Sequence, residues 1–180
     1  MSNQTIETIL NRRSVRSFTN QPVSVQDISL IVEAGLYAPS ARNRQNWHFT
    51  VVTNPEMIEK MHQLTLQGME QRGLKVDEKD HTFYHAPLVI VVSSLIEGFA
   101  EFNAGCAIEN MAIAAKSLGI DSCIIGQTRF MYSQTNKVDV NLMLKVPFEY
   151  EHDCSICFGY AKGEYPVAKE RKAGVVDYIR

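Results

Sequence analysis

The sequence predicts one α+β domain spanning residues 1–180. Two observations carry this prediction. Apolar residues at helical spacing alternate along the chain with short runs of β-branched and apolar residues, a pattern typical of helices and strands mixed in one domain. No internal repeat or low-complexity segment divides the chain, and its length suits a single hydrophobic core. The order of the strands in the sheet does not follow from this pattern.

The first half of the chain is predicted to hold three helices, a strand and a polar excursion. Ser24 and Asn54 are typical N-caps at the starts of two helical patterns. Alternating aromatic and β-branched residues indicate the strand, with Trp47 as its core anchor. The segment 73–85 is polar and aperiodic, so we expect it to run over the surface. The regular elements are helices at 5–12 and 24–36, a strand at 47–53 and a helix from 54 to at least 68.

The second half is predicted to alternate strands with helices. An uninterrupted apolar run at 88–93 indicates a strand that is buried on both faces. The long helix after it is rich in small residues and ends at Gly119 in the C-cap position, so we expect it to pack closely at the centre of the domain. Ser133 is a candidate cap for a weaker helix that Pro147 ends. These elements are strands at 88–93, 121–125 and 152–161 and helices at 99–118 and 133–144.

The C-terminal stretch 163–180 is predicted to be an extended arm. Residues 164–174 are charged and contain Pro166, whereas residues 175–179 have the composition of a strand. A strand so late in the chain must pair with something distant. In a lone subunit it would be a frayed tail, so both possibilities stay open on this pattern alone.

Composition narrows the function classes. Eighteen basic against 20 acidic residues give a net charge of -2, which indicates neither a nucleic-acid surface nor a polybasic membrane patch. The longest apolar run is too short to span a bilayer, and the N-terminus lacks the features of a signal peptide. We therefore expect a cytoplasmic protein without nucleic-acid or membrane partners.

Cysteines and histidines predict no metal site. Cys154 and Cys157 have C-x-x-C spacing, but they lie in an expected strand, where a separation of three places them on opposite faces. No second pair completes a zinc site. His81 and His85 could share a helix face, but no third ligand is evident, and we expect solvated loop histidines.

Four short segments are the candidates for chemistry, since the glycine-rich nucleotide motifs are absent. The first is Arg12-Arg13-Ser14-Val15-Arg16, whose guanidiniums are planar forks of donors suited to a phosphate or to a heterocycle bearing carbonyls. Taken alone, the cluster fits a solvated basic turn better than a binding site. The other three are Pro39-Ser40-Ala41-Arg42-Asn43-Arg44-Gln45-Asn46-Trp47, Ile125-Gly126 and Lys169-Glu170-Arg171.

These segments, in this order, resemble those of the nitroreductase family of FMN-dependent oxidoreductases. Residues 12–16 are similar to the family's R-[RH]-S-x-[RK] signature, residues 39–47 to its P-S-x-x-N-x-Q-P-W segment, and residues 169–171 to its C-terminal K-x-R pair. Asn46 departs from the pattern, because proline is usual there. The resemblance covers nearly the whole chain and implies a central, mainly antiparallel sheet flanked by helices.

The resemblance also implies an FMN site. Arg16 would lie at the pyrimidine edge of the flavin, where a fixed cation stabilises the negative charge that reduction places there. The backbone N–H of Gly126 would address flavin N5, and no dedicated acid or base is expected. Lys169 and Arg171 would clamp the phosphate. The full implied set is Arg12, Arg13, Ser14, Arg16, Pro39, Ser40, Asn43, Gln45, Ile125, Gly126, Lys169 and Arg171.

The implied activity is hydride transfer from NAD(P)H through flavin N5 to an organic acceptor, such as a nitroaromatic or a quinone, in ping-pong order. The family resemblance further implies a homodimer with FMN at the interface, in which Ser40 contacts the partner's flavin and the arm adds a strand to the partner's sheet. Two alternatives stay open: a flavin-binding sensor or carrier without turnover, and another flavin reaction such as dehalogenation or dehydrogenation. The acceptor pocket is expected near 68–85 and 130–132.

Overall fold

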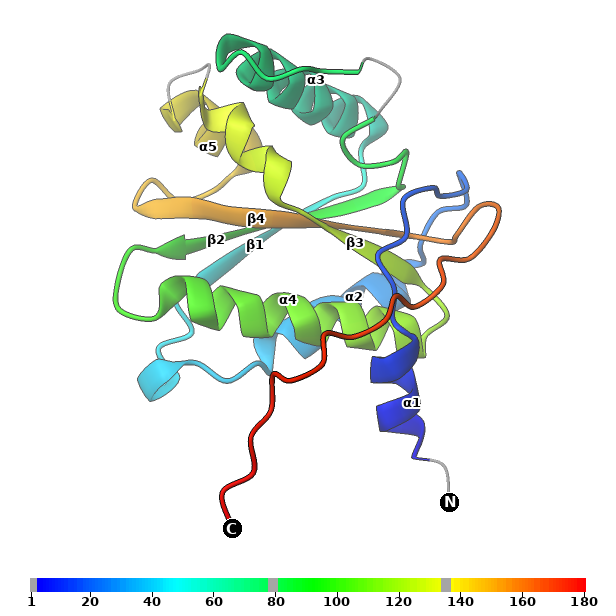
Figure 1. The fold of residues 1–180 in the computed structure, drawn as a ribbon. Helices are drawn as coiled ribbons and strands as arrows, with labels where there is room; N and C mark the ends of the chain where they lie inside the picture. The colour runs from blue at the N-terminus through cyan, green and yellow to red at the C-terminus, as the bar shows by residue number, and fades with distance from the viewer. Residues whose placement is uncertain (1–2, 78–80, 134–136) are drawn as a thin grey trace.

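The computed structural model describes residues 3–77, 81–133 and 137–180. Its helices lie on both faces of one sheet (Figure 1). In chain order, with η for a 3-10 helix, the elements are α1 (Gln4–Asn11), α2 (Val25–Leu36), η1 (Ala41–Asn43), β1 (Trp47–Val52), α3 (Pro55–Gln71), β2 (Leu88–Leu95), α4 (Ala100–Ser117), β3 (Asp121–Ile125), η2 (Gly126–Ser133), α5 (Lys137–Leu144) and β4 (Tyr150–Gly159).

The sheet has four strands in the order β1-β2-β4-β3, and every neighbouring pair is antiparallel. Helices α2 and α4 cover one face, and α3 and α5 cover the other (Figure 1). The predicted α+β class, with a mainly antiparallel sheet flanked by helices, is confirmed. Since β1 and β3 form the edges, the free edge of β3 is open to another segment of the chain.

The central strand β2 is buried on both faces, as predicted. Val89 and Val91 pack with Cys157 in the core under α3, whereas Ile90 and the half-buried Cys154 pack in the core under α2 and α4. This alternation follows the two-residue period of a strand. It confirms that Cys154 and Cys157 face opposite sides of the sheet, and the cysteines are free thiols.

Capping residues determine where the helices begin and end. The side chain of Ser24 accepts a hydrogen bond from the Asp27 N–H at 3.0 Å, and that of Asn54 accepts one from the Met57 N–H at 2.9 Å. Gly119 follows α4 with φ +76°, the left-handed conformation that glycine adopts most easily. The predicted boundaries at these residues are confirmed. Ser133 ends η2, and the helix start predicted there adjoins residues 134–136, which lie outside the described residues.

Helix α3 packs directly on the backbone of η2. A Cβ atom on Gly68 would lie 1.9 Å from the carbonyl oxygen of Phe130, so only glycine allows this approach. Because η2 begins at Gly126, the contact supports the segment that leaves the edge strand β3.

The prediction that residues 73–85 run over the surface with solvated histidines is wrong at its C-terminal end. Phe83 is fully buried in the core, and the side chain of His81 is only 9% exposed, whereas His85 is exposed. Polarity along this segment suggested solvent, but His62 on α3 accepts a hydrogen bond from the Thr82 N–H and His81 accepts one from the Phe83 N–H, which satisfies the backbone of a buried turn.

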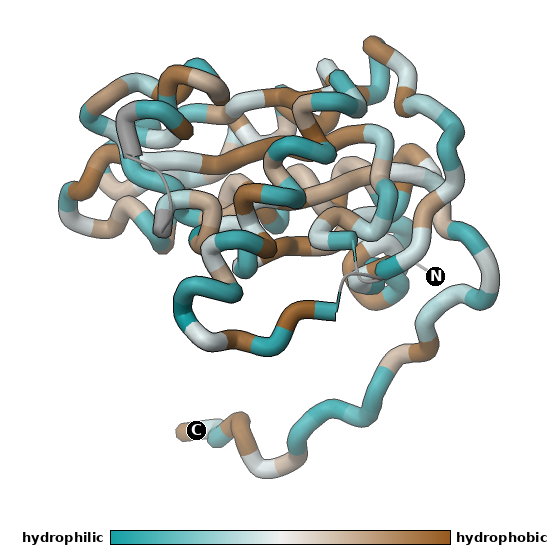
Figure 2. The backbone as a smooth tube through the Cα atoms, turned by 90° about the horizontal axis from the view of Figure 1, so that it is seen from above, coloured by the Kyte–Doolittle hydropathy of each residue, from teal (hydrophilic) through white to brown (hydrophobic). Residues whose placement is uncertain are grey.

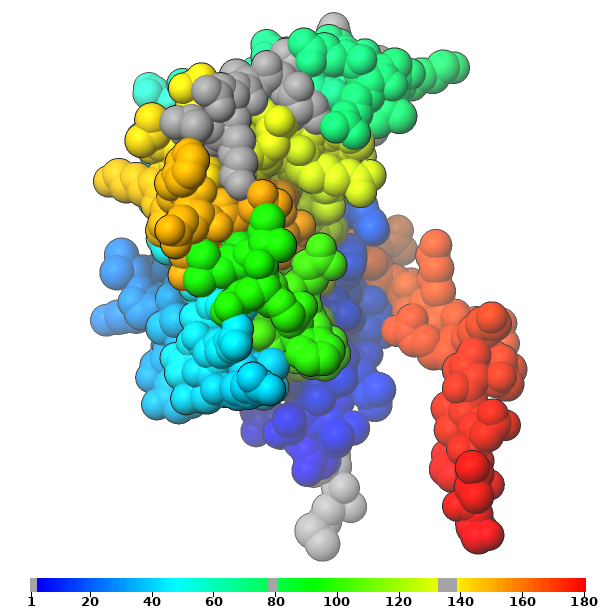
Figure 3. Space-filling model, turned by 90° about the vertical axis from the view of Figure 1, so that its left-hand side faces the viewer, coloured from blue at the N-terminus to red at the C-terminus, as the bar shows by residue number. Residues whose placement is uncertain are grey.

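The C-terminal residues 163–180 form an extended arm without helix or strand, and its tip stands away from the domain (Figure 3). Hydrophilic and hydrophobic residues are mixed along it (Figure 2). The strand-like residues 175–179 are exposed, and their pairing with a second chain stays a prediction. Within the described ranges, no helix is long and apolar enough to cross a bilayer.

Candidate functional site

The segment that carries Arg16 is fixed along the free edge of β3. The N–H of Val15 donates to the carbonyl of Ser122 at 3.0 Å, and Ser14 forms a parallel bridge to the same residue. Further along, the Lys162 N–H donates to the carbonyl of Ser17 at 2.9 Å. Since Val15 is buried, the exposed Arg16 extends from a backbone held on both sides.

Arg12 and Arg13 are both half-buried, and they are held differently. The Nε of Arg12 donates to Oε1 of Glu109 on α4 at 3.0 Å. One terminal nitrogen of Arg13 donates to the carbonyls of Leu10 and Arg12, both at 2.7 Å. Arg13 therefore caps the C-terminal end of α1, which leaves its main chain as the part available to a ligand.

Ile125 and Gly126 lie at the other end of the same edge. Ile125 is buried as the last residue of β3, and Gly126 is exposed. A Cβ on Gly126 would meet nothing within 4 Å, so its backbone is open to a close approach. Gly126 follows Ser122 by four residues, which is about 13 Å of extended chain. The structure thus places Ser14 and Gly126 along one edge of the sheet.

The loop from Pro39 to Gln45 is strained and internally hydrogen-bonded. Arg42, Asn43 and Gln45 have φ values of 56°, 53° and 48°, in the left-handed region that side chains other than glycine rarely adopt. The hydroxyl of Ser40 accepts from the backbone N–H of Gln45 at 3.0 Å, and the side-chain Oδ1 of Asn43 accepts from Nε2 of Gln45 at 2.9 Å. The backbone strain sits in a loop predicted to bind the cofactor.

Asn103 on α4 holds this loop through a pair of amides that sequence reasoning missed. Its Nδ2 donates to Oδ1 of the buried Asn46 at 3.0 Å, and its Oδ1 accepts from the Ala41 N–H at 3.1 Å. Asn46 stands where the family pattern has proline, so an amide clamp fixes the loop at that position. The one visible signal in the sequence was asparagine at position 46 in place of the family's proline, and nothing there marked position 103 as its partner.

The structure does not bring the Ser40 loop together with the Arg12–Arg16 segment. The loop contacts α4 at Asn103, whereas Arg12 contacts it at Glu109, about 9 Å further along the helix axis. In the part of the chain that the structure describes, no hydrogen bond joins the two. The loop instead borders a hollow of about 300 Å³, whose other walls include Phe99 and Phe102.

Lys169 and Arg171 lie on the exposed arm, and among the described residues no hydrogen bond or ion pair joins them to Arg12. The arm is tied to the domain at Tyr165, whose hydroxyl donates to Oδ1 of Asp121 at 2.8 Å and accepts from Nζ of Lys116 at 2.6 Å. Beyond Tyr165 the two cations are exposed to solvent.

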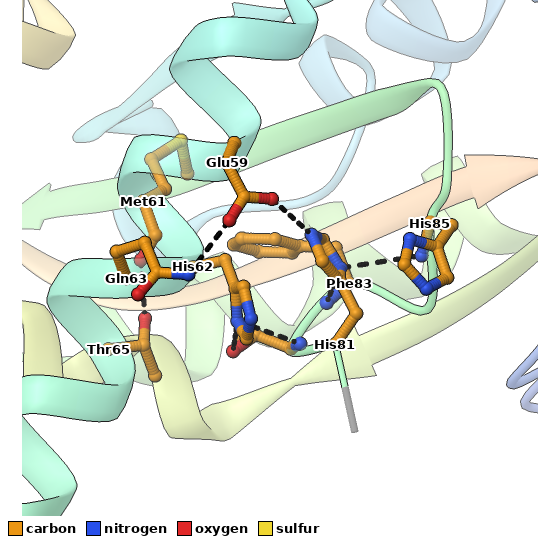
Figure 4. A network of polar contacts seen from close by, with 9 residues as sticks. Glu59, Met61, His62, Gln63, Thr65, His81, Phe83 and His85 are labelled. Carbon is orange, nitrogen blue, oxygen red and sulfur yellow. Dashed lines mark hydrogen bonds and ion pairs between the residues drawn. The ribbon is translucent and has the colours of Figure 1, made fainter. Parts of the chain in front are cut away.

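A histidine cluster lies on α3 and the turn after it (Figure 4), and two of its members, His81 and His85, line a pocket together with Arg16. The rings of His62 and His81 are 4.2 Å apart, and those of His81 and His85 are 4.5 Å apart. The Nε2 of His81 lies 3.4 Å from Oε2 of Glu59. Burial lowers the pKa of His81 to about 4, helped by the neighbouring imidazoles and opposed by Glu59. Nowhere in the described ranges do three or more acidic, histidine or cysteine side chains form a group that could hold a metal.

A family model described as the nitroreductase family matches residues 9–160. The chain belongs to the nitroreductase family. This confirms the resemblance noted in the sequence.

Relatives of known name and structure agree with this assignment. The chain is 33% identical over 143 residues to a Bacillus subtilis protein named FMN reductase (NADPH), covering 71% of this chain and 55% of that protein. A nitroreductase with bound FMN from Bacteroides fragilis is 32% identical to this chain. The alignment covers 99% of this chain and 100% of that one, with a TM-score of 0.90. A second FMN-bound nitroreductase, from Desulfitobacterium hafniense, is 29% identical, with full coverage of both chains and a TM-score of 0.90.

Proposed function

We propose that this nitroreductase-family chain is an FMN-dependent oxidoreductase that takes electrons from NAD(P)H and delivers them to an organic acceptor, such as a nitroaromatic or a quinone, in ping-pong order. The observation that carries the proposal is the edge of β3. It has Arg12, Ser14 and Arg16 at one end and the open backbone of Gly126 at the other.

The donor set on this edge fits FMN. A phosphate monoester requires cations and hydroxyl donors, which Arg12 and Ser14 supply. The isoalloxazine requires a donor near N5 and a positive charge near its pyrimidine edge, which the Gly126 N–H and Arg16 supply. When bound, FMN supplies the hydride-accepting N5 and the two-electron redox chemistry. The chain's own residues bind and orient the cofactor and stabilise negative charge.

We further propose that the site is completed by a second copy of the chain. Ser40, Asn43 and Gln45 lie apart from the β3 edge within one chain, and Lys169 and Arg171 lie on an arm that leaves the domain. Large apolar side chains are exposed around the Ser40 loop and on the arm, as expected of an interface between copies. They include Leu36, Tyr37, Ile96, Phe99, Phe102, Val175, Val176, Tyr178 and Ile179.

The proposal is tested by the absorption spectrum of the purified chain, chromatography of the released cofactor, and steady-state oxidation of NADH and NADPH with nitroaromatic and quinone acceptors. We expect a yellow protein that releases FMN and turns over. An FMN-bound protein without turnover would identify a carrier or sensor, and a colourless protein that FMN cannot reconstitute would contradict the proposal.

A matched pair of variants localises the activity. Arg16→Gln removes the cation at the β3 edge and is expected to lower the rate of NAD(P)H oxidation by about tenfold or more. Lys60→Gln removes an exposed cation from α3 and is expected to leave the rate unchanged.

A further inference from the structure

The turn between α3 and β2 holds two consecutive residues in a conformation that their side chains disfavour. Tyr84 has φ +54° and His85 has φ +59°, and neither is glycine. Such conformations persist only where surrounding contacts impose them, and they gather at functional sites. The hydrogen bonds of the turn, from the Tyr84 N–H to the carbonyl of His81 at 2.8 Å and from the Ala86 N–H to that of Phe83 at 3.0 Å, show that its geometry is well defined.

His81 is the residue that holds the turn to α3. Its Nδ1 accepts a hydrogen bond from the Phe83 N–H at 3.1 Å, and its Nε2 faces Glu59 (Figure 4). An Nδ1 that accepts from a backbone N–H carries no proton, so the ring is the neutral Nε2–H tautomer and donates toward the carboxylate. On the other side Phe83 is fully buried in the core. Tyr84 therefore extends from a turn that is anchored at His81 and at Phe83.

Tyr84 reaches Arg16. Both residues line a pocket of about 200 Å³ that His85 and Lys162 also border, and the Arg16 guanidinium lies close enough to the tyrosine hydroxyl to lower its pKa, against the larger opposing effect of burial. The ring of Tyr84 is half-buried, so it offers a fixed acceptor. An exposed arginine otherwise samples many rotamers, and a fixed partner restricts them.

We propose that Tyr84 is a positioning residue that holds the Arg16 guanidinium in place at the flavin site, and that the His81-anchored turn sets the position of Tyr84. The inference rests on the proposed function, because it concerns the same site. It explains why an unfavourable backbone conformation is kept at Tyr84: the left-handed turn directs the phenol toward the edge of β3 instead of into solvent.

The test is the two-electron midpoint potential of FMN bound to the full chain, compared among the wild type, Tyr84→Phe, Arg16→Gln and the double variant. A guanidinium held near the pyrimidine edge favours the negatively charged, reduced state. Losing its fixed partner is expected to lower the ratio of affinities for reduced and oxidised FMN by about tenfold, or about 30 mV toward negative potential for a two-electron couple. In the Arg16→Gln background, Tyr84→Phe is expected to cause no further shift.

Tyr150→Phe is the matched control, since it removes a tyrosine hydroxyl from the start of β4, where the ring contacts His48. It is expected to leave the potential unchanged. Circular dichroism melting of each variant tests folding, and Tyr84→Phe keeps the ring that fills the site. Should Tyr84→Phe fail to fold, His81→Phe, which removes the acceptor of the Phe83 N–H and so loosens the turn, must shift the potential in the same direction.

The outcomes separate the two proposals. If the wild-type chain binds no FMN, both fall. If it binds FMN and turns over but the potential is the same in wild type and Tyr84→Phe, or if the shift persists undiminished without Arg16, the positioning role is wrong and the proposed function stands.

Discussion

Two groups of cations were predicted to bind the same cofactor, but only one of them is held in place by contacts within the domain. Arg12 and Arg16 belong to a segment whose backbone is hydrogen-bonded to β3, and Arg12 is paired with Glu109. Lys169 and Arg171 lie beyond Tyr165, on an exposed arm. The first group is positioned by one chain alone. The second lies on an arm that this chain alone does not hold, so the proposed site would be half preformed and half dependent on assembly.

Removing the arm is the largest expected perturbation. A chain ending at Gly163 loses both arm cations and the apolar residues 175–179, and we expect it to be monomeric and to bind FMN at least about 100-fold more weakly, because each charge-assisted contact contributes about 1.5–3 kcal/mol. Light scattering and FMN titration measure the two effects. The full-length double variant Lys169→Gln/Arg171→Gln should lose the affinity but stay dimeric, whereas Lys172→Gln should behave as wild type. Unchanged affinity in the truncated chain would contradict the comparison.

Gly68→Ala perturbs the preformed half. The added methyl group collides with the carbonyl oxygen of Phe130, and we expect a loss of about 2–3 kcal/mol in the free energy of unfolding because α3 must move away from η2. Urea denaturation measures this loss. Gly105→Ala on α4 is the control, since its Cβ meets nothing within 4 Å and alanine favours helix by up to about 1 kcal/mol. Equal stability of the two variants would show that the contact with η2 is unimportant.

Acid should weaken the anchored turn. The pKa of His81 is lowered by burial from 6.5 to about 4 in the folded chain, so the unfolded chain binds the proton more readily between these values. Stability is therefore fully present above pH 6.5 and is lost as the pH falls toward 4, by about 2 kcal/mol between pH 7 and pH 5. Glu59 opposes this loss, and His62, whose pKa burial also lowers, adds to it. Urea unfolding at several pH values measures how steeply the free energy of unfolding falls with falling pH. This fall should be smaller for His81→Asn than for the wild type and for the exposed-site control His85→Asn.

Tyr165→Phe, at the point where the arm joins the domain, should have the smallest effect on stability. Its hydroxyl links the arm to Asp121 and Lys116, and losing it is expected to cost about 1 kcal/mol. Limited proteolysis of the arm should become faster, because its root detaches more often. Tyr178→Phe, where the side chain is exposed, should leave the cleavage rate unchanged. Equal cleavage rates in both variants would show that the Tyr165 contacts do not hold the arm.

Much of the fold was predictable because its signals are local. Ser24, Asn54 and Gly119 cap their helices by interactions within a few residues, and the apolar run of β2 specifies its burial by composition. The prediction for the end of the 73–85 segment was wrong because the burial of this end depends on a contact between Thr82 and His62, which is twenty residues away in the chain. Hydrogen bonds over such distances leave no periodic trace in the sequence.

The candidate site divides in the same way. Residues 12–16 and 125–126 were identified from short motifs, and the structure places them on one edge of the sheet. Tyr84 and Asn103 went unnoticed because their roles arise from tertiary contacts with Arg16 and Asn46. Their residue types alone, a tyrosine in a polar segment and an asparagine in a helix, carry no such information.

The most direct test of a site built from two chains is FMN content in mixed dimers. Differently tagged chains carrying Arg12→Gln and Ser40→Glu are co-expressed, and the heterodimer is isolated through both tags. Each parent homodimer should bind no FMN, because one lacks the phosphate cation and the other places a carboxylate near the phosphate. If Ser40 serves the partner's site, one intact site remains and the heterodimer binds one FMN. A heterodimer without FMN would contradict the account, since both sets of residues would then act within the same chain.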